Sequence, residues 1–492
     1  MAAEAPASPP SDQVIVDIKD YVYHYQVTKS KTKTWARARE CLLDSIGCAI
    51  LAISTSEECR ALVGPFVRDT TVQHGFCLPG TQFILDPVKG AFDFGAMIRW
   101  QDFNDGLSGL DWGHPSDNLG AIVAVCDWLC RSGQSNITMR TLLEAMIKAY
   151  EVQGTFQLTN SFNTKGLDHT VLVKLASTAV VSWLIGLSEE QAMAAISHVF
   201  MDGIPLRLFR AGSNCIPRKS WAAGDACMRA VQLALLAREG QPGAPSVLTM
   251  PRWGFYSTTW CGESFQLPRP YETYVMETVA NKVYPCEGHA LPAVEAMLEQ
   301  CQRLKKRGLD ALQDVAAIRV RATKSTVTIL DKPWPLYNFA DRDHCLRYIL
   351  CLTLLKGGPP EVQDYRDDSP WALDRDGWME ATKQKIELLE DAGFTAEYRA
   401  DGRGRPAPPV AGVTVVLRDG QILDEVVIRD GPGTPSHPKT TQAVHDKFRR
   451  NMKAGAFSEL DTEKIIFMVQ DDDLLVSEFV DALRGRMGLS ML

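Results

Sequence analysis

The stretch DHTVLVKLASTAVVSWLIGL, from Asp168 to Leu187, is apolar on nearly every face when it is placed on a helix. A helix that is apolar all round is normally buried inside a large bundle. Five further segments of the first 240 residues repeat apolar residues at the three-to-four spacing that is typical of helices: Ala36–Leu51, Leu119–Arg131, Met139–Thr155, Ser188–Met201 and Trp221–Arg238. The sequence therefore predicts a large all-helical domain, over residues 14–272.

The pattern changes after Pro270. Residues Asp314–Leu330 alternate and are rich in Val, Ile and Thr, which is typical of a strand. Residues Gly412–Ile428 have the pattern of two strands joined at Asp419-Gly420, a strong hairpin signal. We therefore expect a second, smaller α/β domain over residues 273–438.

Both ends of the chain have a different character from their neighbours. Helical spacing returns over Gln442–Gly455 and Leu460–Leu483, so we expect residues 439–492 to pack back on the helical domain. Residues 1–13 are rich in Ala, Pro and acid, and we expect them to be disordered. The first 17 residues lack the Arg and the long apolar run of a targeting peptide, which predicts a cytoplasmic protein.

The composition excludes several classes of function. The 60 acidic residues exceed the 52 Lys plus Arg, and the formal charge of −8 argues against a nucleic-acid partner. The longest nearly uncharged apolar stretch, Ala176–Leu187, falls short of the ~20 residues that a membrane span needs. The 13 cysteines are scattered, and even Cys126 and Cys130 have no matching Cys/His pair nearby, so we expect free thiols and no metal site.

Acidic residues and an imidazole lie close together between two predicted helices. Asp102, Asp105, His114 and Asp117 fall within sixteen residues. A carboxylate beside an imidazole suits proton transfer, because each tunes the pKa of the other. The structural alternative is that Ser116 or Asp117 caps the helix that starts near Leu119.

A second imidazole stands at the start of another predicted helix. His169 is a candidate acid or base, and the alternative is that Asp168 is a helix cap and His169 a surface residue. A basic group follows, in which Arg207, Arg210 and Lys219 fall within thirteen residues. In an acidic protein such a group favours an anionic ligand, although a solvated basic face would look the same.

Two further groups lie in and beside the second domain. Lys282, Glu287 and His289 stand near the expected domain junction, where ligand sites tend to form, or they belong to a polar linker. Arg342, in the stretch ADRDHC, reaches a shared cleft or belongs to an Asp-capped helix start. The sequence contains no nucleotide-binding glycine loop, no zinc-protease motif and no nucleophile elbow. These residues predict acid–base chemistry on an anionic substrate, without a cofactor.

Several strings are long enough to be specific: GAFDFGAMIRWQDFND (Gly90–Asp105), WGHPSDNLG (Trp112–Gly120), NSFN (Asn160–Asn163), GLDH (Gly166–His169), RKSWAAGD (Arg218–Asp225) and ADRDHC (Ala340–Cys345). In these strings the chain resembles the 2-methylcitrate dehydratases of the MmgE/PrpD family, from about Val14 to the C-terminal helices. The resemblance implies a helical domain with a smaller α/β lid, a site between them, no metal and a homodimer. The family also contains cis-aconitate decarboxylase, whose site residues carry over onto these positions: Asp102, His114, His169, Lys219 and Lys282.

The departures from the dehydratase pattern concern bulk beside these positions. Where the pattern has Thr and Trp, this chain has Gly106 and Leu107, and where it has Phe and Gln, this chain has Gly288 and Leu291. We expect a larger and more apolar space, in which each buried methylene contributes about 0.8 kcal/mol. The substrate predicted is a tricarboxylate, a 2-alkylcitrate longer than methylcitrate, as in fungal pathways to alkylated citrate-derived metabolites such as maleidrides.

The resemblance leads to a scheme for dehydration. Lys219, Lys282, Arg207 and Arg210 neutralise the carboxylates, His114 or His169 takes the proton, and Asp102 orients an imidazole or assists the departure of water. The sequence leaves open which histidine is the base. It also leaves three alternatives: a 2-methylcitrate dehydratase of propionate catabolism, a cis-aconitate-type decarboxylase, and an inactive paralogue that binds a tricarboxylate.

Overall fold

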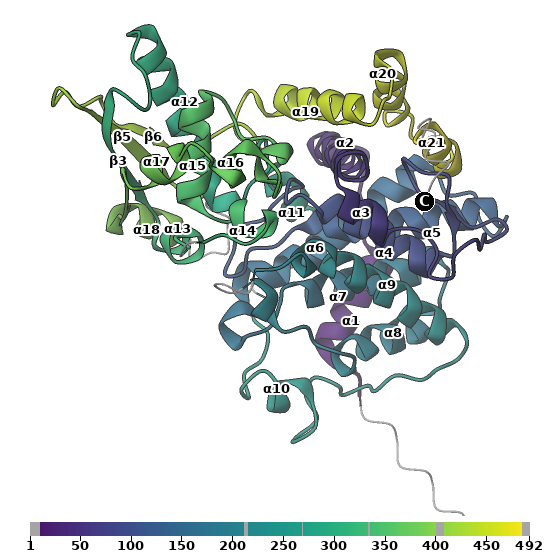
Figure 1. Cartoon of the computed structure of the whole chain (residues 1–492). Coiled ribbons are helices and arrows are strands. Elements are labelled where there is room, and N and C mark those ends of the chain that lie inside the picture. Colours follow the sequence, from purple (N-terminus) through teal and green to yellow (C-terminus); the bar gives the residue numbers. More distant parts are fainter. Residues whose placement is uncertain (1–9, 211–214, 268, 333–334, 400–407, 485–492) are drawn as a thin grey trace, which may run out of the picture.

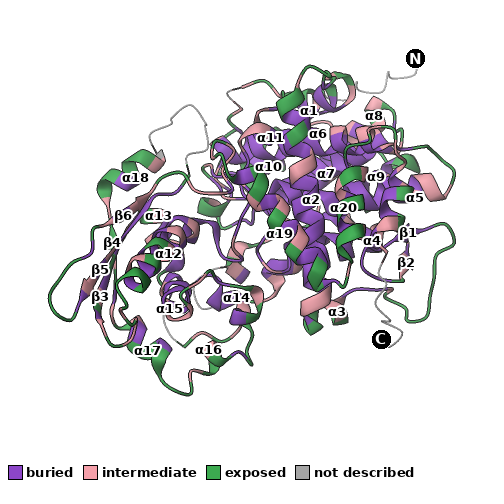
Figure 2. Ribbon diagram, turned by 90° about the horizontal axis from the view of Figure 1, so that it is seen from above, coloured by how far each residue is buried: buried purple, intermediate pink, exposed green. Residues whose placement is uncertain are grey.

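The computed structural model describes residues 10–210, 215–267, 269–332, 335–399 and 408–484. Two hydrophobic cores organise them. The first core belongs to a helical domain and the second to a domain built around a small sheet. Figure 1 shows the two domains side by side, and in Figure 2 buried residues fill the centre of the helical domain.

The helical domain is built from helices of very different length. They are α1 (Gln13–His24), α2 (Thr32–Thr55), α3 (Glu57–Leu62), α4 (Pro87–Arg99), α5 (Leu119–Arg131), α6 (Met139–Thr159), α7 (Thr170–Leu184), α8 (Glu189–Met201), α9 (Arg218–Arg238), α10 (Phe255–Thr258) and α11 (Tyr274–Thr278). Among the described residues, the domain also contains a two-stranded hairpin, β1 (Phe76–Cys77) with β2 (Ile84–Leu85), and the 3-10 turns η1 (Pro115–Asn118), η2 (Asn163–Lys165) and η3 (Arg207–Arg210). The helices expected from apolar spacing are confirmed, with ends that differ by a few residues.

Helix α7 lies at the centre of this domain, as its all-round apolar pattern predicts. Every one of its residues except Trp183 is buried. Its hydroxyl groups are satisfied within the bundle: Thr178 and Ser182 donate to backbone carbonyls one turn earlier, and Ser177 donates to Asn118 at 2.7 Å. Polar side chains are therefore tolerated in a buried helix because each one finds a partner.

Glycines allow α4, α5 and α9 to approach one another closely. A Cβ atom on Gly95 would lie 2.9 Å from the Cα of Gly224, and one on Gly120 would lie 2.7 Å from the Cα of Gly95. Each of these three helices begins or ends beside a candidate site residue. The glycine contacts therefore bring Asp102, His114 and Lys219 into one region.

The second domain contains a four-stranded sheet in the order β4-β3-β5-β6. Its strands are β3 (Val315–Ala322), β4 (Ile386–Glu390), β5 (Ala411–Leu417) and β6 (Val426–Ile428), and only the β3–β4 pair is parallel. Its helices are α12 (Leu291–Lys306), α13 (Lys324–Leu330), α14 (Phe339–Arg342), α15 (Leu346–Lys356), α16 (Pro370–Leu373), α17 (Trp378–Lys383) and α18 (Ala392–Arg399), with 3-10 turns η5 (Gly288–Ala290) and η6 (Val362–Tyr365). Helix α12 packs on β5 and β6 and against α15.

The sheet differs from the sequence prediction in one place. The hairpin is confirmed: β5 and β6 pair antiparallel, and Gly420 takes the left-handed conformation (φ +87°) in the turn between them. The long strand expected over Asp314–Leu330 is wrong in its second half, where Lys324–Leu330 form α13. The side chain of Thr323 accepts a hydrogen bond from the Thr326 N–H at 3.2 Å and caps this helix, so a local cap outweighs the preference of β-branched residues for strands.

The C-terminal helices α19 (Thr440–Ala454), α20 (Glu459–Met468) and α21 (Val476–Ala482) lie on the helical domain. Helix α19 packs along α2, as Figure 1 shows, and α21 packs on α5. Val275, Met276 and Val279 also belong to the helical core, which therefore extends past the boundary expected at 273.

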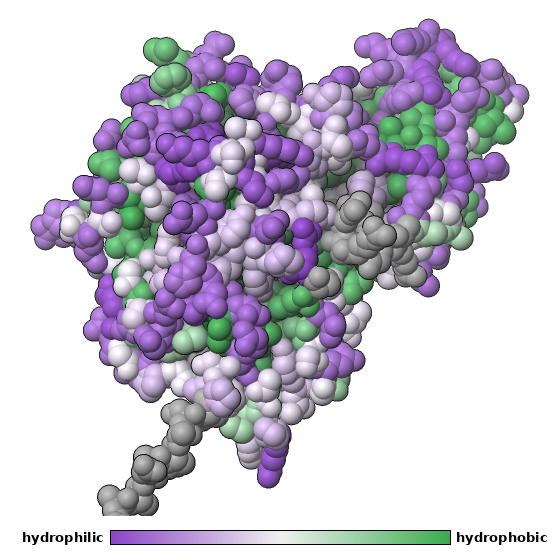
Figure 3. Space-filling model, turned by 180° about the vertical axis from the view of Figure 1, so that it is seen from behind, coloured by the Kyte–Doolittle hydropathy of each residue, from purple (hydrophilic) through white to green (hydrophobic). Residues whose placement is uncertain are grey.

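One face of the molecule is seen in Figure 3. In Figure 3 hydrophilic residues cover most of the face that is visible, with smaller apolar patches between them, and a notch separates the two lobes. Across the described ranges, no helix combines the length and the apolar character that crossing a bilayer requires.

Candidate active site

A buried carboxylate lies at the centre of the candidate site. The chain turns sharply after α4, where Asp102 adopts φ +49°, a left-handed conformation that Asp tolerates better than most residues. The turn brings the carboxylate back onto Arg99, whose Nη1 lies 2.5 Å from Oδ1. Lys282 donates to the same oxygen and, at 2.9 Å, to the backbone carbonyl of Asp102.

Three cations hold this carboxylate in its charged form. Lys219, in the first turn of α9, adds its Nζ at 3.5 Å from Oδ2 of Asp102. Burial alone would raise the pKa of Asp102, but Arg99, Lys282 and Lys219 outweigh it and hold that pKa well below its ordinary value. Asp102 is therefore a counter-ion at neutral pH, and it is not a proton donor.

Two residues of the sheet domain complete this group. Lys219 Nζ also lies 2.9 Å from Asp343 Oδ1 and 3.2 Å from His344 Nδ1, and His344 Nε2 lies 3.4 Å from Asp102 Oδ2. Both follow α14 directly in the chain. We call Arg99, Asp102, Lys219, Lys282, Asp343 and His344 the charge cluster; it joins the two domains.

His114 is held by protein groups at both ring nitrogens. Its Nδ1 lies 2.6 Å from the carbonyl oxygen of Asp105, and its Nε2 lies 2.8 Å from Nη2 of Arg99. A carbonyl only accepts and a guanidinium only donates, so Nδ1 carries the proton and Nε2 accepts. Burial, with the nearby charges of Arg99 and Lys282, holds the pKa of His114 well below its ordinary value. The lone pair of this neutral ring is thus engaged.

His169, the residue before α7, is different. Its ring centroid lies 5.8 Å from that of His114, and only 3% of the residue is exposed. Among the described residues neither of its ring nitrogens has a hydrogen-bond partner. Burial lowers the pKa of His169 to about 3, although the Asp168 carboxylate acts in the opposite direction. A neutral, buried and unpartnered imidazole has a lone pair available for a ligand.

The three candidate arginines occupy different positions. Arg210 is bound to Asp168, with Nε 2.7 Å from Oδ2. Arg207, also in η3, lies 3.8 Å from the same carboxylate, and its side chain is 22% exposed. Arg342 donates to the carbonyl of Tyr365 at 2.7 Å and pairs with Asp367. Arg342 is therefore turned away from the charge cluster, while its neighbours Asp343 and His344 belong to it.

The sequence also allowed these motifs to be helix caps, and the structure shows some of those caps and not others. Asn118 precedes α5 without a capping side-chain bond, whereas Asp168, the cap that the sequence suggested for α7, accepts from the N–H of Thr170 at 3.2 Å. Asn338 caps α14, accepting from the N–H of Asp341 at 3.1 Å. Asp105 accepts from both the N–H and the hydroxyl of Ser116, at 3.1 and 2.6 Å, and so holds the loop that carries His114.

A partly buried chain of hydrogen bonds connects the site to the sheet domain. Glu287 accepts from His289 Nδ1 at 3.0 Å, and His289 Nε2 lies 3.1 Å from the hydroxyl of Tyr398, which accepts from Ser108 at 3.0 Å. Burial would raise the pKa of Glu287, but the neighbouring imidazoles and Lys282 lower it to about 2. The chain links a loop of the helical domain to α18.

The four departures from the dehydratase pattern do not lie together. Gly106, Gly288 and Leu291 line a cavity of about 320 Å³ at the domain junction. Leu107 is fully buried beside Gly154, inside the helical domain. Trp112 lies against both Gly106 and Gly288.

Sequence reasoning missed several members of the site. Arg99, Asp343 and His344 lie inside the quoted strings, and an Asp-His pair was a usable signal for the last two. Lys447 of α19 had no signal. Its buried Nζ lies 2.9 Å from the carbonyl of Lys282 and 2.7 Å from a carboxylate oxygen of Asp44, and it also bonds the carbonyl of Phe103. It therefore supports the backbone on both sides of the charge cluster.

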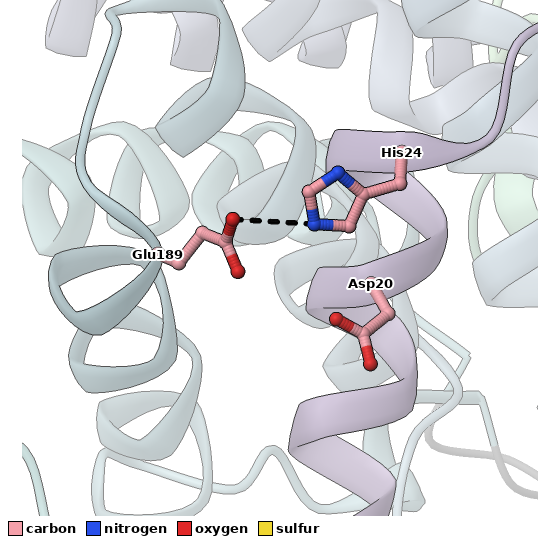
Figure 4. A group of neighbouring side chains, drawn as sticks. All are labelled: Asp20, His24 and Glu189. Carbon is pink, nitrogen blue, oxygen red and sulfur yellow. Dashed lines mark ion pairs between the residues drawn. The ribbon is translucent and has the colours of Figure 1, made fainter.

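Within the described ranges, two groups of side chains have the composition of a metal site. The first is Asp20, His24 and Glu189, shown in Figure 4, where His24 faces Glu189 at 3.2 Å. The ammonium group of Lys19 contacts both carboxylates of this exposed group. The second is Asp102, Asp343 and His344, and the cation that these groups share is the ammonium of Lys219.

Comparison with known proteins covers nearly the whole chain. A family model described as the MmgE/PrpD N-terminal domain matches residues 16–268, and one described as the MmgE/PrpD C-terminal domain matches residues 284–474. The chain is 48% identical over 478 residues to the alkylcitrate dehydratase phiI of a fungal species, which covers 96% of this chain and 93% of that protein. It is 47% identical over 495 residues to the 2-methylcitrate dehydratase-like protein oryR of Aspergillus oryzae, covering 98% and 97%. It is 42% identical over 486 residues to the 2-methylcitrate dehydratase of Escherichia coli, covering 96% and 97%.

Proposed function

The chain belongs to the MmgE/PrpD family, and from this premise we propose that it is a hydro-lyase that removes water from a citrate-type tricarboxylate. The relatives named alkylcitrate dehydratase and 2-methylcitrate dehydratase support this reaction. One observation carries this proposal: the site contains both a neutral His169, whose ring nitrogens have no hydrogen-bond partner among the described residues, and the buried lysines that contact Asp102.

The reaction requires a base and an acid. A proton leaves the carbon next to a carboxylate, its electron pair forms the new double bond, and the tertiary hydroxyl takes up a proton and departs as water. In our proposal His169 accepts the first proton, because its lone pair is free, whereas that of His114 is bound to Arg99.

Lys219 supplies the second proton in this scheme. Its ammonium group is a donor, and His344, 3.2 Å away, is placed to return a proton to it. Arg207 and Lys282 bind carboxylates of the substrate. Arg207 suits this role because, in the part of the chain that is described, its guanidinium contacts Asp168 only as an ion pair at 3.8 Å.

We further propose that the substrate is a 2-alkylcitrate, that the product is the corresponding alkyl-aconitate and that the enzyme is a homodimer that serves the synthesis of an alkylcitrate-derived metabolite. The 48% identity to an alkylcitrate dehydratase supports the choice of substrate. In this scheme the same acid–base groups would act on methylcitrate, because both substrates carry the same carboxylates and tertiary hydroxyl.

The decisive experiment compares the purified protein with His169→Gln on 2-methylcitrate and 2-hexylcitrate. Dehydration appears as ultraviolet absorbance of the conjugated double bond and as loss of water by mass spectrometry. We expect kcat of the variant to fall about 10²–10⁴-fold, the usual contribution of a general base. His24→Gln, on the exposed face of α1, is the matched control and should keep full activity.

Three results would contradict the proposal. Wild-type turnover by His169→Gln would remove the base from the scheme. Release of carbon dioxide would identify a decarboxylase, and binding of the tricarboxylates without turnover would identify an inactive paralogue.

A further inference from the structure

A cavity at the domain junction lies next to the candidate active site. It has a volume of about 320 Å³, at the lower end of the range typical of small-molecule sites. Most of its lining side chains are apolar and come from both domains, among them Ala280, Val283, Leu291, Pro292, Pro409 and Ile428.

The backbone of residues 281–283 lies between the cavity and the charge cluster. Asn281 and Val283 line the cavity, while Lys282 between them reaches Asp102 on the other side. Trp112 also lines the cavity, and its ring lies 4.7 Å from that of His289. The indole of Trp112 is therefore the partition between the cavity and the buried hydrogen-bond chain at His289.

Two glycines determine where this indole lies. A Cβ atom on Gly288 would be 2.1 Å from Cζ2 of Trp112, and one on Gly106 would be 2.8 Å from the same atom. Real atoms do not approach so closely, so any side chain at either position would displace the indole. The indole of Trp112 therefore fills the space beside Gly106 and Gly288 where larger side chains would otherwise lie. The open cavity lies on the other side of the indole.

Charge favours an apolar occupant. Arg429, on the lining, is paired with Glu397 at 2.9 Å, and Glu277 accepts from the Thr34 hydroxyl at 2.6 Å. The other charged groups of the lining are Glu295, which accepts from the Tyr284 hydroxyl at 2.8 Å, and the exposed Lys33. A tricarboxylate needs several cations, which the charge cluster provides and this cavity does not.

We propose that this cavity binds the alkyl chain of the substrate, with Gly106 and Gly288 keeping it open by letting Trp112 lie against them. The inference rests on the proposed function and specifies its substrate class: an alkylcitrate whose chain reaches past Trp112. Each methylene buried there multiplies kcat/KM by about four, which corresponds to about 0.8 kcal/mol.

The test fills the cavity from its far wall. Ile428→Trp adds bulk on β6, and Ile422→Trp, at an isoleucine of the same domain that is 56% exposed, is the matched control. The measured quantity is the ratio of kcat/KM for 2-hexylcitrate to that for 2-methylcitrate. We expect wild type and Ile422→Trp to favour hexylcitrate, and Ile428→Trp to lower the ratio about 60-fold, the effect of excluding about three methylenes.

A second variant alters the cavity by displacing the indole of Trp112. Gly288→Ala places a methyl group where Trp112 now lies, and we expect the ratio to change in the same direction. Partial unfolding lowers the activity on both substrates equally, so it leaves the ratio of hexylcitrate to methylcitrate activity unchanged. Circular dichroism detects such a loss of folding independently.

The outcomes separate the two proposals. If wild type dehydrates neither substrate, the proposed function fails and this inference fails with it. If wild type dehydrates both, but without preference, or if folded Ile428→Trp keeps the wild-type ratio, the alkyl chain does not bind here and the proposed function stands.

Discussion

Replacement of Asp102 by Asn tests the electrostatic core of the site. Arg99, Lys219 and Lys282 contribute three positive charges to the charge cluster, and Asp102 and Asp343 contribute two negative ones. Its net charge is therefore +1, and in Asp102→Asn it becomes +2 within a buried volume. Asn tolerates the left-handed conformation at this position as well as Asp does, so backbone strain does not contribute.

The magnitude follows from the contacts that are lost. Removing one partner of a buried ion pair costs about 3–5 kcal/mol, because the remaining charge stays buried without compensation. Lys219 keeps Asp343 at 2.9 Å, so the loss falls mainly on Arg99 and Lys282. We expect the free energy of unfolding to drop by about 3–5 kcal/mol and Tm by about 6–10 °C, at about 2 °C per kcal/mol for a large domain.

The assay is thermal unfolding with and without citrate, together with turnover. A bound tricarboxylate supplies the missing negative charge, so citrate should raise Tm of Asp102→Asn more than that of wild type. Asp105→Asn is the control, since this buried carboxylate contacts Ser116 and forms no ion pair within the described part of the chain. It should cost about 1–3 kcal/mol and show no extra response to citrate. Retention by Asp102→Asn of wild-type Tm and turnover would refute the reasoning.

Three further predictions concern single groups. The pKa of buried His169 is about 3, below the value of about 6.5 in an unfolded chain, so the unfolded state takes up the proton first and stability is lost as pH falls from 6.5 towards 3. His114 and His344, whose pKa values burial also lowers, act in the same direction, so the share of His169 is isolated by comparing wild type with His169→Gln. Between pH 7 and pH 5 the loss of stability measured by urea unfolding should be smaller in the variant by about 2 kcal/mol, and an equal loss in the two proteins would disprove the assignment. Lys447→Met should lower the free energy of unfolding by about 3–5 kcal/mol, because it leaves Asp44 buried without its cation. In denaturant titrations the double variant with Asp44→Leu should recover part of this loss, whereas strictly additive losses would show that the pair is not coupled. Arg207→Gln should raise KM for the tricarboxylate, whereas Arg342→Gln, whose guanidinium binds the Tyr365 carbonyl, should change stability and leave KM as it is; the reverse result in steady-state kinetics would place Arg342 at the substrate.

The relation between sequence and structure differs from element to element. Periodicity was sufficient for α7, because burial on every face leaves an all-round apolar pattern. It was insufficient for residues 324–330, where alternating β-branched residues looked like a strand and the hydroxyl of Thr323 starts a helix. A single side-chain cap is decided by local geometry that an alternating pattern does not reveal.

The candidate site shows the same division. The strings around Asp102, His114, His169, Lys219 and Lys282 were recognisable in the sequence, and the structure brings Asp102 together with both lysines. In the stretch ADRDHC, by contrast, the sequence favoured Arg342, and the end of α14 turns that side chain away and directs Asp343 and His344 inward. Neighbours in sequence point in different directions once a helix ends, so a motif alone does not say which member reaches the site.

By itself, the sequence determined the helical character of the larger domain, the hairpin at Asp419-Gly420, the family and the residue types available for proton transfer. Only the tertiary structure decided how they combine. It separated a His114 engaged by Arg99 from a His169 that has no hydrogen-bond partner among the described residues. It also brought Lys447 to the carbonyl of Lys282 from the far end of the chain and filled the space at Gly106 and Gly288 with Trp112. The reason is physical: periodicity and motifs record local preferences, whereas the protonation state, partner and free volume of a buried group depend on atoms that folding brings from distant parts of the chain.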